Sequence, residues 1–191
     1  MKLIVAAMRE EAQKLNQKNV IITGVGKVNA AFHLTDALAK NQVDAIYNVG
    51  FAGASHHYQI GDIIIIKEAM YHDFNLSAFG YQKGEVPHLK FPFQSDDKLL
   101  NEAISTLPNA KISTLYTGDY FMTEKVDKPY VCDMEGASLY QVALLKNIPI
   151  IAIKVVSDIV GMDHHIENYK AFEQSKGASL IAKIVSQLIK E

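Results

Sequence analysis

Short apolar runs, each followed by a turn and a helical pattern, constrain the fold of this chain more than any other feature. The first runs are residues 2–7, 20–22 and 45–49, which are rich in Leu, Ile, Val and Ala without polar alternation. Such runs are typical of strands that are buried on both faces. After the second run, two glycines and then apolar residues at helical spacing predict a helix over residues 27–41. Strand, glycine turn, helix and strand predict a parallel sheet covered by helices.

The later part of the chain departs from this alternation of strands and helices. Residues 61–69 form its most β-prone run, and no clear helix separates them from the strand before. Residues 71–95 are rich in aromatic residues, Gly and Pro, which predicts a long ordered excursion because a linker would be polar. We expect further helices at residues 8–15, 96–107, 134–146 and 168–190, and strands at 111–117 and 149–156. Together these elements predict an α/β fold, a three-layer α/β/α sandwich with a mixed, strongly curved central sheet.

Length and composition limit the class of protein. A chain of 191 residues is long enough for one sizeable core but short for two, so we expect a single domain over residues 1–191. The net charge is −2 and no stretch is dense in Lys or Arg, which argues against a nucleic-acid partner. No apolar run reaches the roughly 20 residues that cross a bilayer, and charge at residues 9–11 comes too early for an export signal. We therefore expect a cytoplasmic protein with no membrane partner.

Three acidic residues follow predicted strands. Glu11 comes after the first strand, Glu135 lies in the apolar and small-residue run 131–138, and Asp158 follows the last strand. Open α/β sheets bind ligands at the carboxyl ends of their strands, where a carboxylate can also be desolvated. Glu11 could simply start a helix and Asp158 could cap one, without any chemical role. Glu135 is the stronger candidate, because the small residues Gly136 and Ala137 after it leave room for a ligand. Spacing alone does not bring the three side chains together.

The glycine turn at Gly24-Val25-Gly26 invites a dinucleotide-binding interpretation, because it lies between a strand and a helix. The dinucleotide fingerprint needs a third glycine where Asn29 stands and an acid where Asn48 stands. These mismatches argue against a dinucleotide cofactor. A binding site for a hydroxyl, a water or a small anion and a simple tight turn both remain open.

Histidine and cysteine give no firm sign of a metal site or a thiol nucleophile. The pairs His56-His57 and His164-His165 have no supporting metal-ligand spacing, so we expect structural or loop histidines and no metal. Cys132 is the single cysteine and cannot form an internal disulfide. No His and amide in a supporting sequence context accompany it, so we expect a buried thiol outside the chemistry.

Seven groups of residues form an informative series along the chain. They are Met8-Arg9-Glu10-Glu11, residues 24–31, residues 48–53, Tyr71-His72-Asp73 with residues 78–81, Gly118-Asp119-Tyr120-Phe121-Met122, Asp133-Met134-Glu135, and Val156-Ser157-Asp158. In this order they resemble the motifs of the 5'-methylthioadenosine/S-adenosylhomocysteine nucleosidases, within the nucleoside phosphorylase superfamily. The resemblance covers nearly the whole chain. It implies hydrolysis of the N-glycosidic bond of an adenine nucleoside, with release of adenine and the ribose product and without a metal or organic cofactor.

The resemblance also implies a role for each site residue. Glu11 would activate the attacking water, Glu135 would bind the ribose hydroxyls, and Asp158 would protonate the departing base. The residues implied in substrate binding are Met8, Phe51, Ala52, Gly53, Phe79, Pro87, Phe121, Met122, Met134, Ser157 and Ile166. Phe79 and Pro87 would cap the pocket of a neighbouring copy, which implies a homodimer.

Two features depart from the family pattern. Phe51 stands where the nucleosidases usually carry serine, and the segment between Met122 and Cys132 is shorter. Alternatives are a phosphate-dependent purine nucleoside phosphorylase, a hydrolase of another modified nucleoside, and a catalytically weak nucleoside-binding protein. The only arginine is Arg9, so few bidentate ligands are available for a phosphate substrate. Hydrolysis is therefore favoured over phosphorolysis. The presence of all three carboxylates argues against a weak binding protein, because a degenerate site would have no need to keep them.

Overall fold

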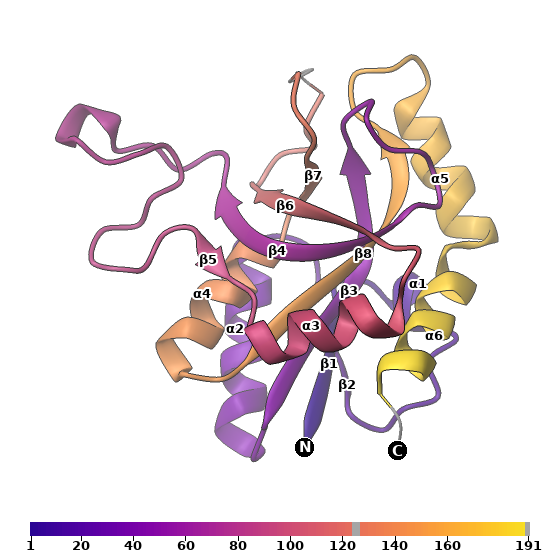
Figure 1. Ribbon diagram of the computed structural model, residues 1–191, viewed down its shortest axis with the longest axis horizontal. Coiled ribbons are helices and arrows are strands. Elements are labelled where there is room, and N and C mark those ends of the chain that lie inside the picture. Colours follow the sequence, from indigo (N-terminus) through magenta and orange to yellow (C-terminus); the bar gives the residue numbers. More distant parts are fainter. Residues whose placement is uncertain (124–126, 190–191) are drawn as a thin grey trace.

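A mixed sheet between two layers of helices forms the centre of the molecule in the computed structural model, which describes residues 1–123 and 127–189 (Figure 1). The strands are β1 (Lys2–Ala6), β2 (Val20–Ile22), β3 (Ala45–Ala54), β4 (Ile63–Tyr71), β5 (Phe93–Gln94), β6 (Lys111–Thr117), β7 (Val131–Asp133) and β8 (Ile150–Ile159). The helices are α1 (Arg9–Ala12), α2 (Lys27–Lys40), α3 (Asp97–Thr106), α4 (Gly136–Lys146), α5 (His165–Ser175) and α6 (Gly177–Leu188), with a 3₁₀ turn η1 (Ser77–Phe79). The predicted fold class is confirmed.

Strand direction shows why the sheet is mixed. β1 runs parallel to β2 and β3, as the glycine-turn pattern predicts, and β3 runs parallel to β8. β4 is antiparallel to β8, and β7 is antiparallel to β3. The carboxyl ends of β1, β3 and β8 therefore point toward one edge of the sheet, away from the N-terminus of the chain (Figure 1).

Two apolar cores lie on opposite faces of the sheet. Successive strand residues alternate between the faces, so that Ile46 contributes to one core and Tyr47 to the other. α2 and α4 cover the first face, for example with Leu34 and Leu139. α3, α5 and α6 cover the second face, for example with Leu99. Burial on both faces is the physical reason why the central strands are apolar without alternation.

Residues 71–95 make the excursion that their composition predicts (Figure 1). The chain leaves the sheet after β4, forms η1 and returns at β5. The ring of Phe93 packs edge-on against that of Tyr71, with 5.9 Å between centroids, and thereby ties the return to the departure. Across the described ranges 1–123 and 127–189, none of the helices combines the length and apolarity that a membrane span needs.

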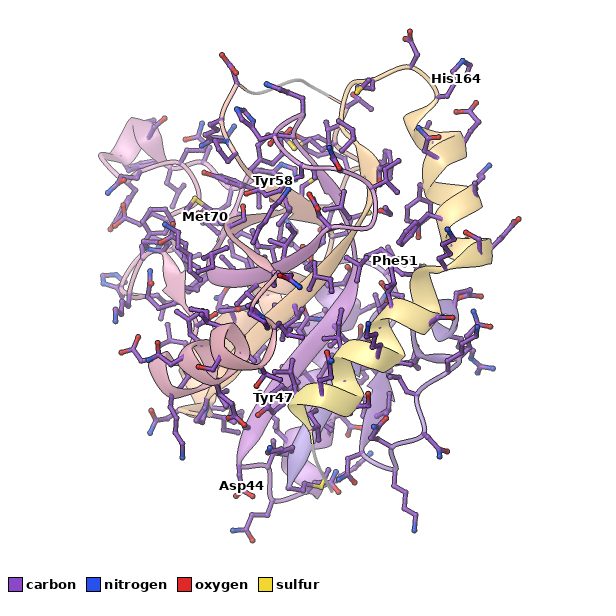
Figure 2. The ribbon with its side chains drawn as sticks, turned by 45° about the vertical axis from the view of Figure 1, so that its right-hand side comes forward. Asp44, Tyr47, Phe51, Tyr58, Met70 and His164 are labelled. Atoms are coloured by element: carbon purple, nitrogen blue, oxygen red, sulfur yellow. The ribbon has the colours of Figure 1, made fainter. Side chains whose placement is uncertain are left out.

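The prediction of one final helix over residues 168–190 is wrong. α5 begins earlier, at His165, and ends at Ser175, and α6 begins at Gly177. A Cβ atom at Gly177 would overlap the ring of Phe51, which lies on the sheet side of this junction (Figure 2). The close approach of the Phe51 ring to the backbone fits a break at this position. Residue 190 lies outside the described residues, as do residues 124–126 of the segment that is shorter than in the family.

β3 and β8 are also longer than predicted, and β7 is a strand where the sequence indicated only a junction. β3 extends to Ala54 and β8 to Ile159, and their pairing shifts by one residue between Ala52 and Gly53. The apolar pattern ends at small residues in β3 and at the polar Ser157 and Asp158 in β8. The pairing between the two strands continues beyond these points. Tertiary pairing therefore overrides the local signal.

Replacing Gly177 with Ala should destabilise the protein, because the added methyl group would force the Phe51 ring to move. We expect a loss of about 1 to 3 kcal/mol in the free energy of unfolding, as for other overpacked cores. Urea unfolding followed by circular dichroism measures it. Ser186→Ala, at an exposed position of the same helix, should change stability by less than about 0.5 kcal/mol. Equal stability of Gly177→Ala and the unsubstituted protein would contradict this packing role.

Candidate active site

A pocket of about 190 Å³ opens at the sheet edge where β1, β3 and β8 end. The three acids predicted to be catalytic, Glu11, Glu135 and Asp158, line it together. Most predicted binding residues line it as well, namely Met8, Phe51, Ala52, Gly53, Phe121, Met122, Met134 and Ser157. The tertiary structure thus collects side chains from α1, β3, β8 and the segment around β7 in one place.

Three predicted binding residues do not line this pocket. Phe79 lies on η1 and is 77% exposed, and Pro87 lies farther along the same excursion. Ile166 lies in the first turn of α5 and is 49% exposed. The contribution of Phe79 and Pro87 to the pocket of a second copy stays a prediction.

Glu11 is buried and held by three backbone N–H groups. Its Oε2 accepts hydrogen bonds from Ala7 (2.9 Å) and Met8 (3.0 Å), and its Oε1 accepts one from Phe51 (2.8 Å). The carboxylate lies against Gly50, where a Cβ atom would come within 2.5 Å of Oε1. Burial raises the pKa of Glu11, although Lys154 and the three N–H groups oppose this effect.

Glu135 lies at the start of α4 and faces the first glycine turn. Its Oε1 accepts a hydrogen bond of 2.9 Å from the backbone N–H of Gly26, which has φ of 96°. The turn whose role the sequence left open therefore binds a carboxylate of the protein itself. Burial and then the neighbouring Asp133 raise the pKa of Glu135 to about 7, against the opposing effects of Lys154 and the Gly26 N–H. Near neutral pH, this group is present in both protonation states.

Asp158 lies near the end of β8 and is 1% exposed. The Ser157 hydroxyl donates to its Oδ1 at 2.7 Å, and the same hydroxyl lies 3.2 Å from the carbonyl oxygen of Ala52. A Cβ atom at Gly53 would come within 3.1 Å of the other carboxylate oxygen, so a larger residue there would crowd the acid. Burial raises the pKa of the nearby Cys132 thiol, and Asp158 adds to this effect. The thiol therefore stays protonated, which fits the expectation that it is not a nucleophile.

A network of charges positions the turn at residues 118–122, which carries Phe121. The ammonium of Lys27 contacts the carboxylate of Asp73 at 2.6 Å. That carboxylate accepts a hydrogen bond from the Asp119 N–H (2.8 Å), and the Asp119 carboxylate accepts one from the Lys27 N–H (2.9 Å). The turn is thus fastened to the N-terminus of α2 and to the residues after β4.

Aromatic rings form a wall of the pocket. The Tyr169 ring on α5 packs edge-on against Phe121 and Phe51, with centroid distances of 6.2 and 6.5 Å. The Phe51 ring also packs against Phe172, at 5.6 Å. Such a wall can bind a flat heteroaromatic base through its face or edge.

Sequence reasoning missed Lys154 and Tyr169. The Lys154 ammonium lies 2.9 Å from Asp133 Oδ2, and both side chains are 3% exposed. The available signal was a single lysine inside the apolar strand β8. Tyr169 gave no comparable signal, because an aromatic residue on an amphipathic helix usually packs in the core.

One group of residues within the described ranges could hold a metal ion, and it lies outside the pocket lining. His56, His57 and Asp127 each offer one ligand atom within 4.8 Å of the others, and all three side chains are exposed. The pocket acids have another counter-ion, because Asp133 and Lys154 form an ion pair beside them. One cation of the protein itself thus lies among the acids of the pocket.

Comparison with known proteins defines the class of this fold and site. Residues 6–190 match the sequence profile of the phosphorylase superfamily. The chain is 32% identical over 183 residues to a 5'-methylthioadenosine/S-adenosylhomocysteine nucleosidase of Bacillus subtilis (strain 168). The matched region covers 87% of this chain and 79% of the relative. A Borrelia burgdorferi B31 structure, described as such a nucleosidase bound to adenine, has a TM-score of 0.90 and 28% identity over 98% of both chains. Futalosine hydrolase of Helicobacter pylori strain 26695 shares the fold, with a TM-score of 0.88 and 22% identity over 98% of this chain and 96% of that chain.

The helix-covered mixed sheet and the pocket at its carboxyl edge are thus those of an enzyme of the phosphorylase superfamily. Within it, the chain belongs to the 5'-methylthioadenosine/S-adenosylhomocysteine nucleosidase family. The resemblance drawn from the sequence motifs is confirmed.

Replacing Glu135 with Gln should make the protein more stable at alkaline pH but not at acid pH. Because the pKa of Glu135 is raised from 4.5 to about 7, the folded state binds this proton more tightly than the unfolded chain. The stabilisation is complete below the unfolded pKa and is lost as pH rises through about 7. Glutamine carries no charge to desolvate, so the variant should gain up to about 3 kcal/mol over the unsubstituted protein near pH 8.

Thermal unfolding near pH 5 and near pH 8 measures this difference. Glu10→Gln changes an exposed carboxylate in the same way and should leave the unfolding temperature nearly unchanged at both pH values. If Glu135→Gln changed the unfolding temperature equally at both pH values, a raised pKa for Glu135 would be contradicted.

Proposed function

We propose that this protein hydrolyses the N-glycosidic bond of adenine nucleosides such as 5'-methylthioadenosine or S-adenosylhomocysteine and releases adenine. One observation carries the proposal: three buried carboxylates from separate elements line one pocket beside an aromatic wall. The names of the relatives in the same family support the choice of substrate.

Glu135 suits the stabilisation of positive charge on the ribose. Cleavage of the glycosidic bond develops an oxocarbenium-like ribose, which a nearby carboxylate stabilises electrostatically. The Lys154 ammonium and the Gly26 N–H both help Glu135 to ionise, against burial and the negative charge of Asp133. In its ionised form Glu135 would also bind the ribose hydroxyls, while Met134 packs against the sugar.

Glu11 suits the activation of water. Its pKa is raised by burial, which makes its carboxylate a stronger base than an exposed glutamate. The three N–H groups of Ala7, Met8 and Phe51 hold it in one orientation. We therefore assign Glu11 as the base that removes a proton from the attacking water.

Asp158 and the turn around Phe121 suit the departing base. Asp158 would donate a proton to the base, and the Ser157 hydroxyl would orient its carboxyl group. Phe121 would stack on adenine, while backbone groups of Phe121 and Met122 bind its edge. A protonated base leaves more readily because less negative charge develops on it.

Water is a better acceptor than phosphate for this pocket. The lining residues within the described ranges include no Lys, Arg or His, but they do include Glu11, Asp133, Glu135 and Asp158. A phosphate dianion would meet carboxylates without a cationic ligand among these side chains. This observation favours hydrolysis over phosphorolysis.

Adenine should be released from 5'-methylthioadenosine in phosphate-free buffer by the purified protein. Asp158→Asn should lower kcat/KM by about 10²-fold or more, because the base then leaves without its acid. Coupled oxidation of released adenine measures the rate. Asp163→Asn, an exposed neighbour in the next loop, is the matched control and should retain activity. Release that depends on added phosphate would instead establish a phosphorylase.

We also propose that two copies form a homodimer in which the excursion of residues 71–95 reaches the neighbouring pocket. Phe79 at its tip is 77% exposed, although it is apolar. Val28 and Phe32 on α2 are 78% and 64% exposed, and α2 lies on the same side of the molecule as the excursion (Figure 1). Exposed apolar side chains on elements of one side of the molecule fit an interface between proteins.

Phe79→Asp should therefore weaken both assembly and activity. We expect the unsubstituted protein to sediment as a dimer and the variant to shift toward a monomer with a lower kcat/KM. Ile60→Asp places the same charge at another exposed apolar position and should leave the dimer intact. A fully active monomer would contradict this arrangement.

We further propose a cytoplasmic location. Cys132 is a free, buried cysteine, and it is the only cysteine of the chain. A fold without disulfides suits a reducing compartment.

A further inference from the structure

We propose that Lys154 is a positioning residue of the active site, whose buried ammonium group fixes the start of α4 through Asp133 and serves as the shared counter-charge of Glu135 and Glu11. The kinetic part of this inference rests on the proposed function. Its spectroscopic part does not.

Lys154 is a charged side chain at a buried position, where the loss of hydration must be compensated. Lys154 lies in the middle of β8 and is 2% exposed. An ammonium group in such a place is destabilising unless a carboxylate and hydrogen bonds compensate for the lost water. Its Nζ meets Asp133 Oδ2 at 2.9 Å, and the Asp133 side chain is equally buried.

Asp133 carries the influence of Lys154 to Glu135. Its Oδ1 accepts a hydrogen bond from the Thr117 hydroxyl (2.6 Å), and its Oδ2 accepts one from the Gly136 N–H (3.0 Å). The N–H of Glu135 also points to Oδ1, at 3.4 Å. Asp133 thus holds the peptide units on both sides of the Glu135 side chain, and Lys154 holds Asp133.

Strand register brings Lys154 to Glu11 as well. Lys154 on β8 is the direct neighbour of Gly50 on β3. Paired residues of adjacent strands project to the same face of a sheet. A Cβ atom at Gly50 would touch the carboxylate of Glu11, so this carboxylate lies on the face from which Lys154 projects.

Among residues 1–123 and 127–189, the neighbouring titratable groups supply no second cation. Besides Glu11, Asp133 and Glu135, the groups that face the cluster are Asp158 on β8, Cys132 on β7, Tyr169 on α5, Tyr140 on α4 and His72 after β4. Burial raises the pKa of Cys132, Tyr140 and Tyr169 and lowers that of His72, so these groups stay neutral near pH 7. One ammonium group therefore serves several acids.

The sign of its effect follows from these positions. Burial alone would lower the pKa of Lys154, but Asp133, Glu11 and Glu135 outweigh burial and raise it, so the ammonium persists through neutral pH. Lys154 in turn opposes the rise in the pKa of Glu11 and Glu135. Without this charge, both glutamates should hold their protons to higher pH.

The kinetic test is the pH dependence of kcat/KM for adenine release by Lys154→Met and Lys154→Arg. Methionine keeps much of the side-chain volume without the charge. The acid limb of the kcat/KM profile of Lys154→Met should therefore move to higher pH by about one unit or more. The rate near pH 7 should fall about tenfold or more and recover as pH rises. Arginine keeps the charge, so the acid limb of Lys154→Arg should lie at the same pH as that of the unsubstituted protein. An equal loss at every pH would indicate a structural role only and overturn the proposal.

A second pair of variants covers the case in which Lys154→Met alone does not fold. Asp133→Asn removes the charge that Lys154 neutralises, and the double variant Asp133→Asn/Lys154→Met removes the whole ion pair. The acid limb of the double variant should lie at higher pH than that of Asp133→Asn. Coincident limbs for these two proteins would contradict the role of Lys154 as a counter-charge.

A titration without substrate separates this inference from the proposed function. Carbon-13 NMR of glutamate carboxyl groups follows Glu135 directly, with its signal identified by its loss in Glu135→Gln. We expect the titration midpoint of Glu135 to be higher in Lys154→Met than in the unsubstituted protein. It should likewise be higher in Asp133→Asn/Lys154→Met than in Asp133→Asn. An unchanged midpoint would overturn the proposal even in an active enzyme. A raised midpoint in a protein that releases no adenine would uphold it while the proposed function fails.

Discussion

The burial of several carboxylates around one ammonium group is the constraint on which the rest of this structure depends. Carboxylates lose favourable hydration when they leave water, so each needs a partner or a proton. Lys154 supplies a charge to Asp133 directly, while backbone N–H groups hold Glu11 and Glu135. The compensation is partial, since the pKa of Glu135 still rises to about 7. Partial compensation suits catalysis, because a buried carboxylate with a raised pKa, such as that of Glu11, is a stronger base than an exposed one.

Close approach of backbone to carboxylate explains several of the glycines at this edge. Gly50 leaves room for the carboxylate of Glu11, and Gly136 leaves room for that of Asp133. Gly26 adopts a positive φ of 96° and presents its N–H to Glu135. The turns after parallel strands therefore do more than reverse the chain. They bring N–H groups to acids from distant parts of the sequence, as the carboxyl edge of an α/β sheet allows.

Phe51, at the position where the family usually carries serine, makes two kinds of contact. Its backbone N–H binds Glu11, whereas its ring packs against α5 and fills the space beside Gly177. The change from serine thus leaves the contact to Glu11 in place, and the ring supports the helix that carries Tyr169 over the pocket. Futalosine hydrolase shares this fold. A fold does not by itself determine a substrate, which depends on the side chains of the site.

Local sequence signals determined most strands and helices, the glycine turns and the candidate acids, because apolar periodicity and backbone requirements act over a few residues. The motif series also indicated the family and therefore the grouping of Glu11, Glu135 and Asp158. Only the tertiary structure decided the ion pair of Lys154 with Asp133, the place of Tyr169 and the break before Gly177. Each of these depends on contacts between residues far apart in the chain, and such contacts leave no periodic trace in the sequence. A lysine in an apolar strand shows that a partner must exist, but strand register and helix packing decide which carboxylate it meets.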